Sequence, residues 1–237
     1  MKNPGLTELA TLLDTYLEVE RFPEETVNGV YRLSSTPIQR LGLALEPFDS
    51  LYALVEDENL DALFLHRPWR IETLRLPPGV GILSYHLPFD EKLAVGYNLP
   101  LAERLGLTNL ESLGSKKGRP LGMIGNLSAA TQLTPALSSL FDGLERVEAA
   151  PGAFHQRIAI VGAMTPALVS EAATRGASAY ITGAWRERAR RAVEGARLDV
   201  WIVGHERSEL WGLSVLRTII EGNFSNLEVR LVAPKQA

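Results

Sequence analysis

Three of the four histidines in this 237-residue sequence stand at or just past the end of short apolar segments that are typical of buried strands. These are His66, His86 and His205. Two of the three have a carboxylate four residues further on, Asp90 and Glu209, at the expected beginning of a helix. Open α/β sheets bind their ligands in loops at the carboxyl ends of strands, where such side chains converge. The five residues are therefore candidates for one metal-binding pocket.

The chemistry of this set favours a transition-metal ion. Imidazole nitrogen and carboxylate oxygen, at about 2 Å, suit zinc, iron or manganese, whereas calcium requires oxygen ligands alone. The sequence contains no cysteine, which excludes disulfides, thiolate zinc sites, iron–sulfur clusters and cysteine nucleophiles. Backbone N–H groups at a helix start would keep Asp90 and Glu209 ionised and able to bind.

The same residues have a purely structural interpretation. Each histidine would be a core or surface residue at the end of a strand, and each carboxylate would balance a helix dipole. Spacing alone leaves both interpretations open.

Apolar periodicity predicts the elements that would position these side chains. Strands are expected at residues 40–45, 61–65, 81–85, 157–161, 179–182, 200–203 and 227–232. Helices are expected at residues 6–17, 48–56, 88–97, 101–105, 166–175, 186–194 and 208–221. The alternation of strand and helix is typical of largely parallel sheets covered by helices.

Two similar α/β lobes follow from this pattern, with largely parallel or mixed sheets and helices packed on them. Residues 1–113 form the expected first lobe, which carries His66, His86 and Asp90. A glycine-rich polar stretch between residues 106 and 125 indicates a linker, and we assign residues 114–151 to it. Residues 152–237 form the expected second lobe, which carries His205 and Glu209.

The net charge and the absence of common nucleotide-binding motifs argue against several classes of binding partner. The net charge of −4 gives no basic face, so neither nucleic acid nor an anionic membrane surface is favoured. Without a signal peptide or an apolar stretch of about 20 residues, the expected location is the cytoplasm. The glycines after Ile158 and around Lys117 do not complete a dinucleotide or phosphate-loop motif. His155, which has no carboxylate at useful spacing, is expected at the surface or in a linker.

Four motifs carry a resemblance to a known family. Residues 64–68, Phe-Leu-His-Arg-Pro, resemble an apolar strand that ends in His-His-Pro, and residues 85–90, Tyr-His-Leu-Pro-Phe-Asp, resemble His-Thr-Asn-Leu-Asp. Residues 176–183 resemble Gly-Ala-Asp-Ala-Tyr-Ile-Thr-Gly, and residues 204–209 match Gly-His-x-x-Ser-Glu. In this order the motifs resemble the Ngg-one-interacting-factor-three family of GTP cyclohydrolase I type 2 homologues, in its short form without the inserted domain.

The resemblance implies a two-lobed subunit with a two-metal site between the lobes, assembled with copies of itself into a toroidal hexamer. It makes His66, His86, Asp90, His205 and Glu209 the metal ligands, for one or two ions of zinc, iron or manganese per subunit. It also suggests GTP or another nucleotide-like small molecule as the substrate.

Arg67 departs from the family pattern, because it replaces the second histidine of His-His-Pro with a cation that cannot bind metal. One hypothesis is that its guanidinium lies beside Asp90 and Glu209 and replaces the second ion. The alternative is that Arg67 turns outward and is solvated.

The expected function is that of a metal-dependent hydrolase, with Glu209 and His86 as the candidate catalytic residues. Glu209 would hold the ion, and His86 would orient water or transfer a proton. The alternative is a metal-binding or metal-delivery protein, or an assembly scaffold, without catalytic activity. The loss of an imidazole at Arg67 favours that alternative.

Overall fold

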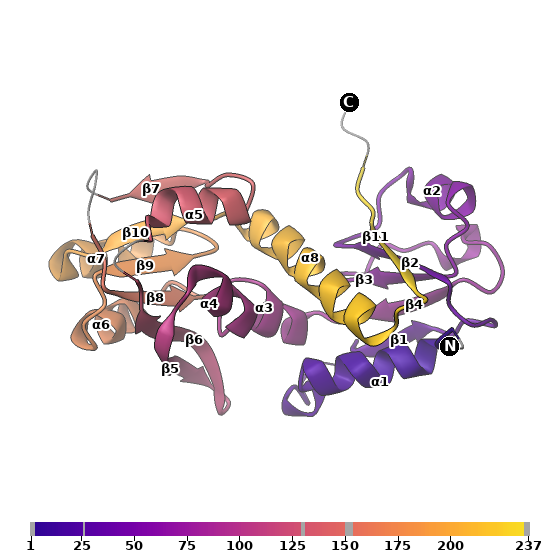
Figure 1. Cartoon of the computed structure of the whole chain (residues 1–237), viewed down its shortest axis with the longest axis horizontal. Coiled ribbons are helices and arrows are strands. Elements are labelled where there is room, and N and C mark those ends of the chain that lie inside the picture. The colour runs from indigo at the N-terminus through magenta and orange to yellow at the C-terminus, as the bar shows by residue number, and fades with distance from the viewer. Residues whose placement is uncertain (1–2, 26, 129–130, 150–153, 235–237) are drawn as a thin grey trace. The chain divides into compact units, whose positions relative to one another are not determined.

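A computed structural model of the chain describes residues 3–25, 27–128, 131–149 and 154–234. Two compact units emerge from the contacts along the chain, one formed by Met1–Phe89 with Leu213–Ala237 and the other by Asp90–Gly212. Each unit is built on one mixed β-sheet with helices packed against it (Figure 1). This architecture confirms the expected α/β class.

The first unit contains a five-stranded sheet. Its strands, in spatial order, are β1 (Gly29–Arg32), β4 (Gly81–Ser84), β3 (Ala62–Leu65), β2 (Arg40–Ala44) and β11 (Glu228–Leu231). β1 is antiparallel to β4, and the other neighbours are parallel. Every residue of β3 and β4 is buried, which explains why both strands read as continuous apolar runs.

Helices α1 (Leu6–Tyr16) and α2 (Leu51–Asp57) belong to the first unit, together with the 3₁₀ turns η1 (Val19–Arg21) and η2 (Thr73–Arg75). α1 lies against β1 and β4 through its apolar face, with Leu9 and Leu13 fully buried. Two helices cross the division of the chain: α3 (Leu87–Leu93) begins in the first unit, and α8 (His205–Asn223) ends in it.

The second unit contains a six-stranded sheet. Its strands, in spatial order, are β5 (Thr108–Lys116), β6 (Arg119–Asn126), β8 (Arg157–Val161), β9 (Ala179–Thr182), β10 (Asp199–Ile202) and β7 (Arg146–Glu148). β8, β9 and β10 are parallel, and the remaining strands pair antiparallel with their neighbours.

The helices of the second unit cover two apolar clusters, to which neighbouring strand residues such as Ile158 and Ala159 contribute separately. These helices are α4 (Leu99–Leu105), α5 (Leu133–Leu140), α6 (Pro166–Thr174) and α7 (Arg190–Ala196), with the 3₁₀ turn η3 (Glu187–Ala189). Alternation along the parallel strands therefore gives the sheet a hydrophobic layer on each face.

The expected linker is wrong, because the glycine-rich stretch is the β5–β6 hairpin. Lys117 and Gly118 both have positive φ, 51° and 77°, as a two-residue hairpin turn of type I′ requires. The polar composition that suggested a linker therefore belongs to a tight turn and to the largely exposed strand β5.

The lobe boundaries also differ from those expected at residues 1–113, 114–151 and 152–237. Residues 114–116 and 119–126 lie in the sheet of the second unit, and β11 pairs in parallel with β2 of the first unit. Sequence spacing could not reveal a strand that returns to a sheet formed much earlier in the chain. The expected boundary at residues 151–152 itself lies outside the described residues.

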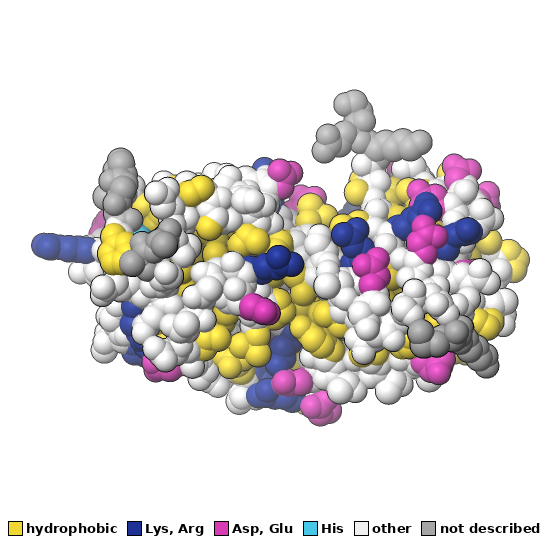
Figure 2. All heavy atoms as spheres, viewed as in Figure 1, with side chains coloured by type: hydrophobic (Ala, Val, Ile, Leu, Met, Phe, Trp, Pro, Cys, Tyr) yellow, Lys and Arg dark blue, Asp and Glu magenta, His cyan; other side chains and the backbone are white. Residues whose placement is uncertain are grey.

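Within the described residues, no helix is both long and apolar enough to cross a membrane. On the face drawn in Figure 2, cationic and anionic side chains are interspersed among apolar ones and do not form a single basic surface.

Candidate metal centre

Two neighbouring parallel strands bring His66 and His86 to the same edge of the first unit's sheet. β3 pairs with β4 so that Leu65 lies opposite Ser84. His66 directly follows β3, and His86 follows β4 after one intervening residue. The two imidazole rings lie 5.1 Å apart between centroids. His66 is fully buried, and the His86 side chain is 24% exposed, so one ring faces the core and the other is accessible.

Oxygen atoms beside both rings favour one tautomer of each imidazole. The Nδ1 atom of His66 lies 2.9 Å from the carbonyl oxygen of Tyr85, which can only accept a hydrogen bond. The Nδ1 atom of His86 lies 3.3 Å from Oε2 of Glu25. Each contact favours a proton on Nδ1 and leaves the lone pair on Nε2, the arrangement of a metal-ligating histidine.

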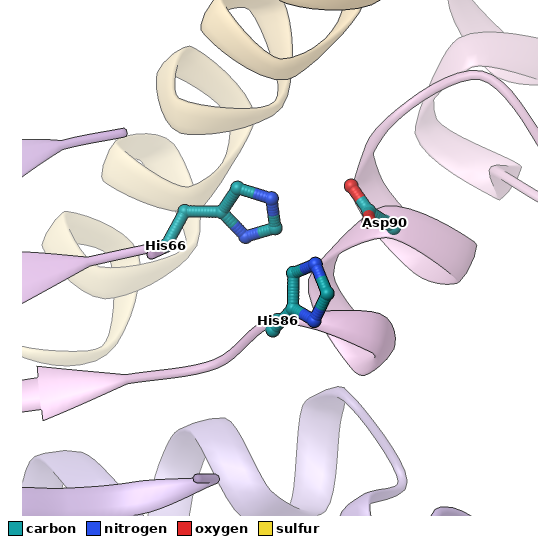
Figure 3. A group of neighbouring side chains, drawn as sticks. All are labelled: His66, His86 and Asp90. Atoms are coloured by element: carbon teal, nitrogen blue, oxygen red, sulfur yellow. The ribbon is translucent and has the colours of Figure 1, made fainter. Parts of the chain in front are cut away.

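Asp90 completes the group from the first turn of α3, four residues after His86. One potential ligand atom from each of His66, His86 and Asp90 lies within 4.8 Å of the others. Figure 3 shows the two rings and the carboxylate converging from β3, the loop after β4 and α3. Ligands bound to one ion at about 2 Å would lie up to about 4 Å apart, so these donors need only small movements. Their chemistry fits zinc, iron or manganese.

His205 and Glu209 form a second pair, at the beginning of α8. The Nε2 atom of His205 lies 3.0 Å from Oε1 of Glu209. The His205 side chain is 64% exposed, whereas Glu209 is fully buried. The three-residue cluster does not include this pair. Within the second unit, however, Asp90 and His205 line the same pocket, which has a volume of about 170 Å³.

The alternative in which Arg67 turns outward and is solvated is wrong. Its side chain is only 16% exposed, and its Nε atom donates to Oε1 of Glu46 at 3.0 Å. A negative partner within the first unit therefore stabilises this cation.

Sequence patterns missed Glu25. The carboxylate beside His86 comes 61 residues earlier in the chain, before β1. Nothing in the local sequence distinguishes it from the neighbouring glutamates. Only the pairing of β1 with β4 brings this part of the chain to the ends of the site strands.

The prediction for His155 is also wrong. It is 6% exposed, and its ring nitrogens lie 3.0 Å from Oγ of Ser178 and 3.2 Å from Oδ2 of Asp199. The carboxylate absent from the local sequence comes from β10, two strands away in the sheet.

Fold and site together define a mixed α/β protein with two sheets and a candidate His/Asp metal centre. The family described as Duf34/NIF3 (NGG1p interacting factor 3) matches residues 70–236, well over half of the sequence. The chain belongs to this family.

Relatives and solved structures agree with this assignment. The GTP cyclohydrolase 1 type 2 homolog of Archaeoglobus fulgidus is 25% identical over 91% of this chain and 93% of its own length. The homolog of Allochromatium vinosum is 26% identical over 90% and 91%.

Similar folds occur in a Bacillus cereus protein related to NIF3, with a TM-score of 0.74 and 13% identity, and in reduced HcgD from Methanocaldococcus jannaschii, with 0.68 and 20%. The first covers 100% of this chain and 99% of its own, and the second 98% and 97%. At these identities the structures establish the shared fold.

Proposed function

We propose that this protein is a divalent-metal-dependent hydrolase that acts on a nucleotide-like substrate. The observation that carries the proposal is the convergence of ligand atoms from His66, His86 and Asp90 within 4.8 Å. The substrate class is supported by relatives named GTP cyclohydrolase 1 type 2 homolog. No described residue in the cluster selects a guanine base, so the proposal extends to nucleotides in general.

A divalent ion held at this site would supply Lewis acidity, which would make water a nucleophile near neutral pH. In this proposal His66, His86 and Asp90 would hold the ion. Glu25 fixes the ring of His86 through its contact with Nδ1, so that Nε2 binds the ion or orients water.

Glu209 and His205 are suited to handling a proton. Glu209 is fully buried and lies 3.0 Å from the largely exposed His205 ring. A proton accepted by the carboxylate can pass to the imidazole and from there to solvent. Both groups lie on the first two turns of one helix, which keeps their separation constant.

The pocket that Asp90 and His205 line limits the size of the group that can bind there. Small residues, among them Gly96, Gly183 and Ser208, line part of its wall. Its volume of about 170 Å³ is below the roughly 300 Å³ at which whole-ligand pockets begin. We infer that it receives the reacting part of the substrate and that the remainder stays outside.

Elemental analysis of the purified protein tests the site before any reaction is assumed. The protein is stripped with a chelator, reconstituted separately with zinc, iron and manganese, and incubated with nucleotides and phosphoesters. We expect turnover that depends on the metal and is abolished in Glu209→Ala. The exposed Ser170 of α6 provides the control variant Ser170→Ala, which should remain fully active.

Two outcomes separate this function from its alternative. Tight, exchangeable metal with no turnover would support a non-catalytic metal-binding or metal-delivery protein, which the replacement of an imidazole by Arg67 favours. Failure to retain any of the three metals would refute both. We also propose that Arg67 takes the place of a second ion, and two tightly bound ions per subunit would contradict this.

We further propose that the chain assembles with itself into a hexamer, as its resemblance to the family suggests. Light scattering on the eluting protein should give a mass near six times the 26.0 kDa of one chain. A monomeric mass across the accessible concentration range would contradict this assembly.

A further inference from the structure

The parallel strands of the second unit bring three reactive side chains together at their amino ends. Ser178 directly precedes β9, Asp199 is the first residue of β10, and His155 lies two residues before β8. The Nδ1 atom of His155 lies 3.0 Å from Oγ of Ser178, and its Nε2 atom lies 3.2 Å from Oδ2 of Asp199. A hydroxyl, an imidazole and a carboxylate in this order form the constellation of nucleophilic hydrolases.

The sheet itself holds the three residues. The backbone N–H of Ser178 donates to the carbonyl of Arg157 at 3.0 Å, and that of Asp199 donates to the carbonyl of Ser178 at 3.1 Å. The imidazole meets the ring of Trp201 edge-on, with centroids 5.1 Å apart. Trp201 is fixed in turn, because its Nε1–H donates to Oγ1 of Thr134 at 2.9 Å. The geometry is therefore defined by strands and by a packed tryptophan.

The neighbours of His155 assign its protonation. The contact between Nε2 and Asp199 is electrostatic, because the two atoms are 3.2 Å apart without the geometry of a hydrogen bond. The negative charge of Asp199 favours the tautomer with its proton on Nε2, and in that tautomer the lone pair on Nδ1 faces the hydroxyl of Ser178, which also lies 3.5 Å from the carbonyl oxygen of Arg157. Nδ1 is then the general base. In many serine hydrolases the two ring nitrogens have the opposite roles, but either nitrogen of a neutral imidazole can accept the proton. Ser178 is exposed while His155 is buried, so the nucleophile is accessible and the base is shielded.

A cavity of about 630 Å³ opens beside the serine. Phe154 and Leu127 supply an apolar wall, and Asn126, Gln156 and Ser178 supply polar groups. The NH1 group of Arg157 donates to Oδ1 of Asn126 at 2.9 Å. This bond orients the amide so that its nitrogen is the remaining donor, suited to stabilise an oxyanion.

We propose that Ser178, His155 and Asp199 form a second, metal-independent nucleophilic site, which hydrolyses small carboxylic esters with an apolar acyl group. The oxygen Oγ of Ser178 bonds to the ester carbonyl carbon while His155 Nδ1 takes the hydroxyl proton. The carbon–alkoxide bond then breaks, and His155 returns the proton to the departing alcohol. Water attacks the acyl-serine with His155 again as base, which releases the carboxylic acid and restores the Ser178 hydroxyl.

The experiment uses the full chain with a fluorophosphonate probe and with 4-nitrophenyl acetate and butyrate. We expect one phosphonyl adduct per chain, located on Ser178 by peptide mass analysis, and ester turnover that is unchanged in chelator. Ser178→Ala should abolish both, and His155→Gln should slow labelling by about 100-fold or more, as expected for loss of a general base. Asp199→Asn keeps the side-chain shape and should slow labelling without loss of fold.

Ser170→Ala is the matched control, because it removes another exposed serine of the same unit. It should label and turn over like the unmodified protein. No adduct on Ser178 in the folded protein would overturn the proposal. The contacts of His155 with Ser178 and Asp199 would then only hold the strand ends together. An adduct whose rate is unaffected in Asp199→Asn and His155→Gln would overturn the assigned roles of those two residues.

Discussion

Histidines lie at strand ends in both units, but the groups beside them differ and favour different chemistry. In the first unit, His66 and His86 direct Nδ1 toward oxygen acceptors, and Asp90 lies close by. In the second unit, both nitrogens of His155 face side chains, a serine hydroxyl and a carboxylate. The comparison teaches that the groups beside each ring, more than a position at a strand end, determine whether an imidazole binds metal or transfers protons.

The largest expected effect concerns the core that supports the first histidine pair. Phe64 is fully buried and contacts the rings of Tyr85 and Phe89, with centroids 6.1 and 5.7 Å away. Phe64→Ala should lower the free energy of unfolding by about 3–5 kcal/mol, because it leaves a cavity beneath the site. Denaturant unfolding measures this loss, and calorimetric titration measures metal affinity.

Phe141→Ala is the matched control in the second unit, where Phe141 is buried and contacts Trp211. It should lower stability by a comparable amount and leave metal affinity unchanged under native conditions. Equal weakening of metal binding by both variants would show that general stability, and not the core of the first unit, limits the site.

Removal of a proposed ligand should have the next largest effect. Asp90→Ala should weaken divalent-metal binding by at least about 100-fold, since loss of even an outer partner costs about 10–100-fold. Competition with a chromophoric chelator provides the measurement. Glu103→Ala removes an exposed carboxylate from the same unit and should bind metal normally. Normal metal affinity in Asp90→Ala would show that Asp90 is not a ligand, and would contradict the view that the neighbours of His66 and His86 prepare them to bind metal.

A smaller effect is expected from the residue that orients His86. Glu25→Gln keeps the size of the side chain but removes its charge, and we expect metal affinity to fall by about tenfold. The exposed Glu20 provides the control Glu20→Gln. The same chelator competition distinguishes them. An unchanged affinity in Glu25→Gln would mean that the 3.3 Å contact does not tune the imidazole.

The smallest effect concerns the free energy of unfolding at acid pH, to which an ion-pair network in the second unit contributes. Arg157, and then Arg175, hold the pKa of Glu111 below its ordinary value of 4.5 through hydrogen bonds. Since the folded-state pKa is the lower one, this stabilisation is present above pH 4.5 and is lost as the pH falls through the folded-state value. Glu111→Gln should flatten this slope slightly in denaturant unfolding measured at pH 2–6. An unchanged slope would show that solvent screens the contacts of this exposed carboxylate.

Most of the parallel strands could be predicted from the sequence, because burial on both faces makes them continuous apolar runs. β3 and β4 are examples. Of the five residues that the sequence predicts as one pocket, the structure groups the two histidines after these strands with Asp90. β1 and β7 were missed, since they are short strands at sheet edges with exposed residues and no apolar run. The hairpin β5–β6 was missed because its long first strand is largely exposed.

Contacts between distant segments could not be predicted. Glu25 reaches His86 only through the pairing of β1 with β4, and Asp199 reaches His155 only across the strand order of the second sheet. The spacing of residues along the sequence therefore does not show that either carboxylate lies beside its histidine. For the same reason the sequence identified His205 and Glu209 as a pair four residues apart but did not reveal that one is exposed and the other fully buried.

The parallel pairing of β11 with β2 has a consequence for biosynthesis. A nascent chain that has not yet reached residue 228 presents the edge of β2, with its apolar Leu41 and Leu43, without its native neighbour. Such an edge is a template for strand addition by other chains. The strands of the second unit, in contrast, are all synthesised before that point. Ribosome-bound chains are thus expected to complete the second sheet first and to need protection of the first until the last strand is made.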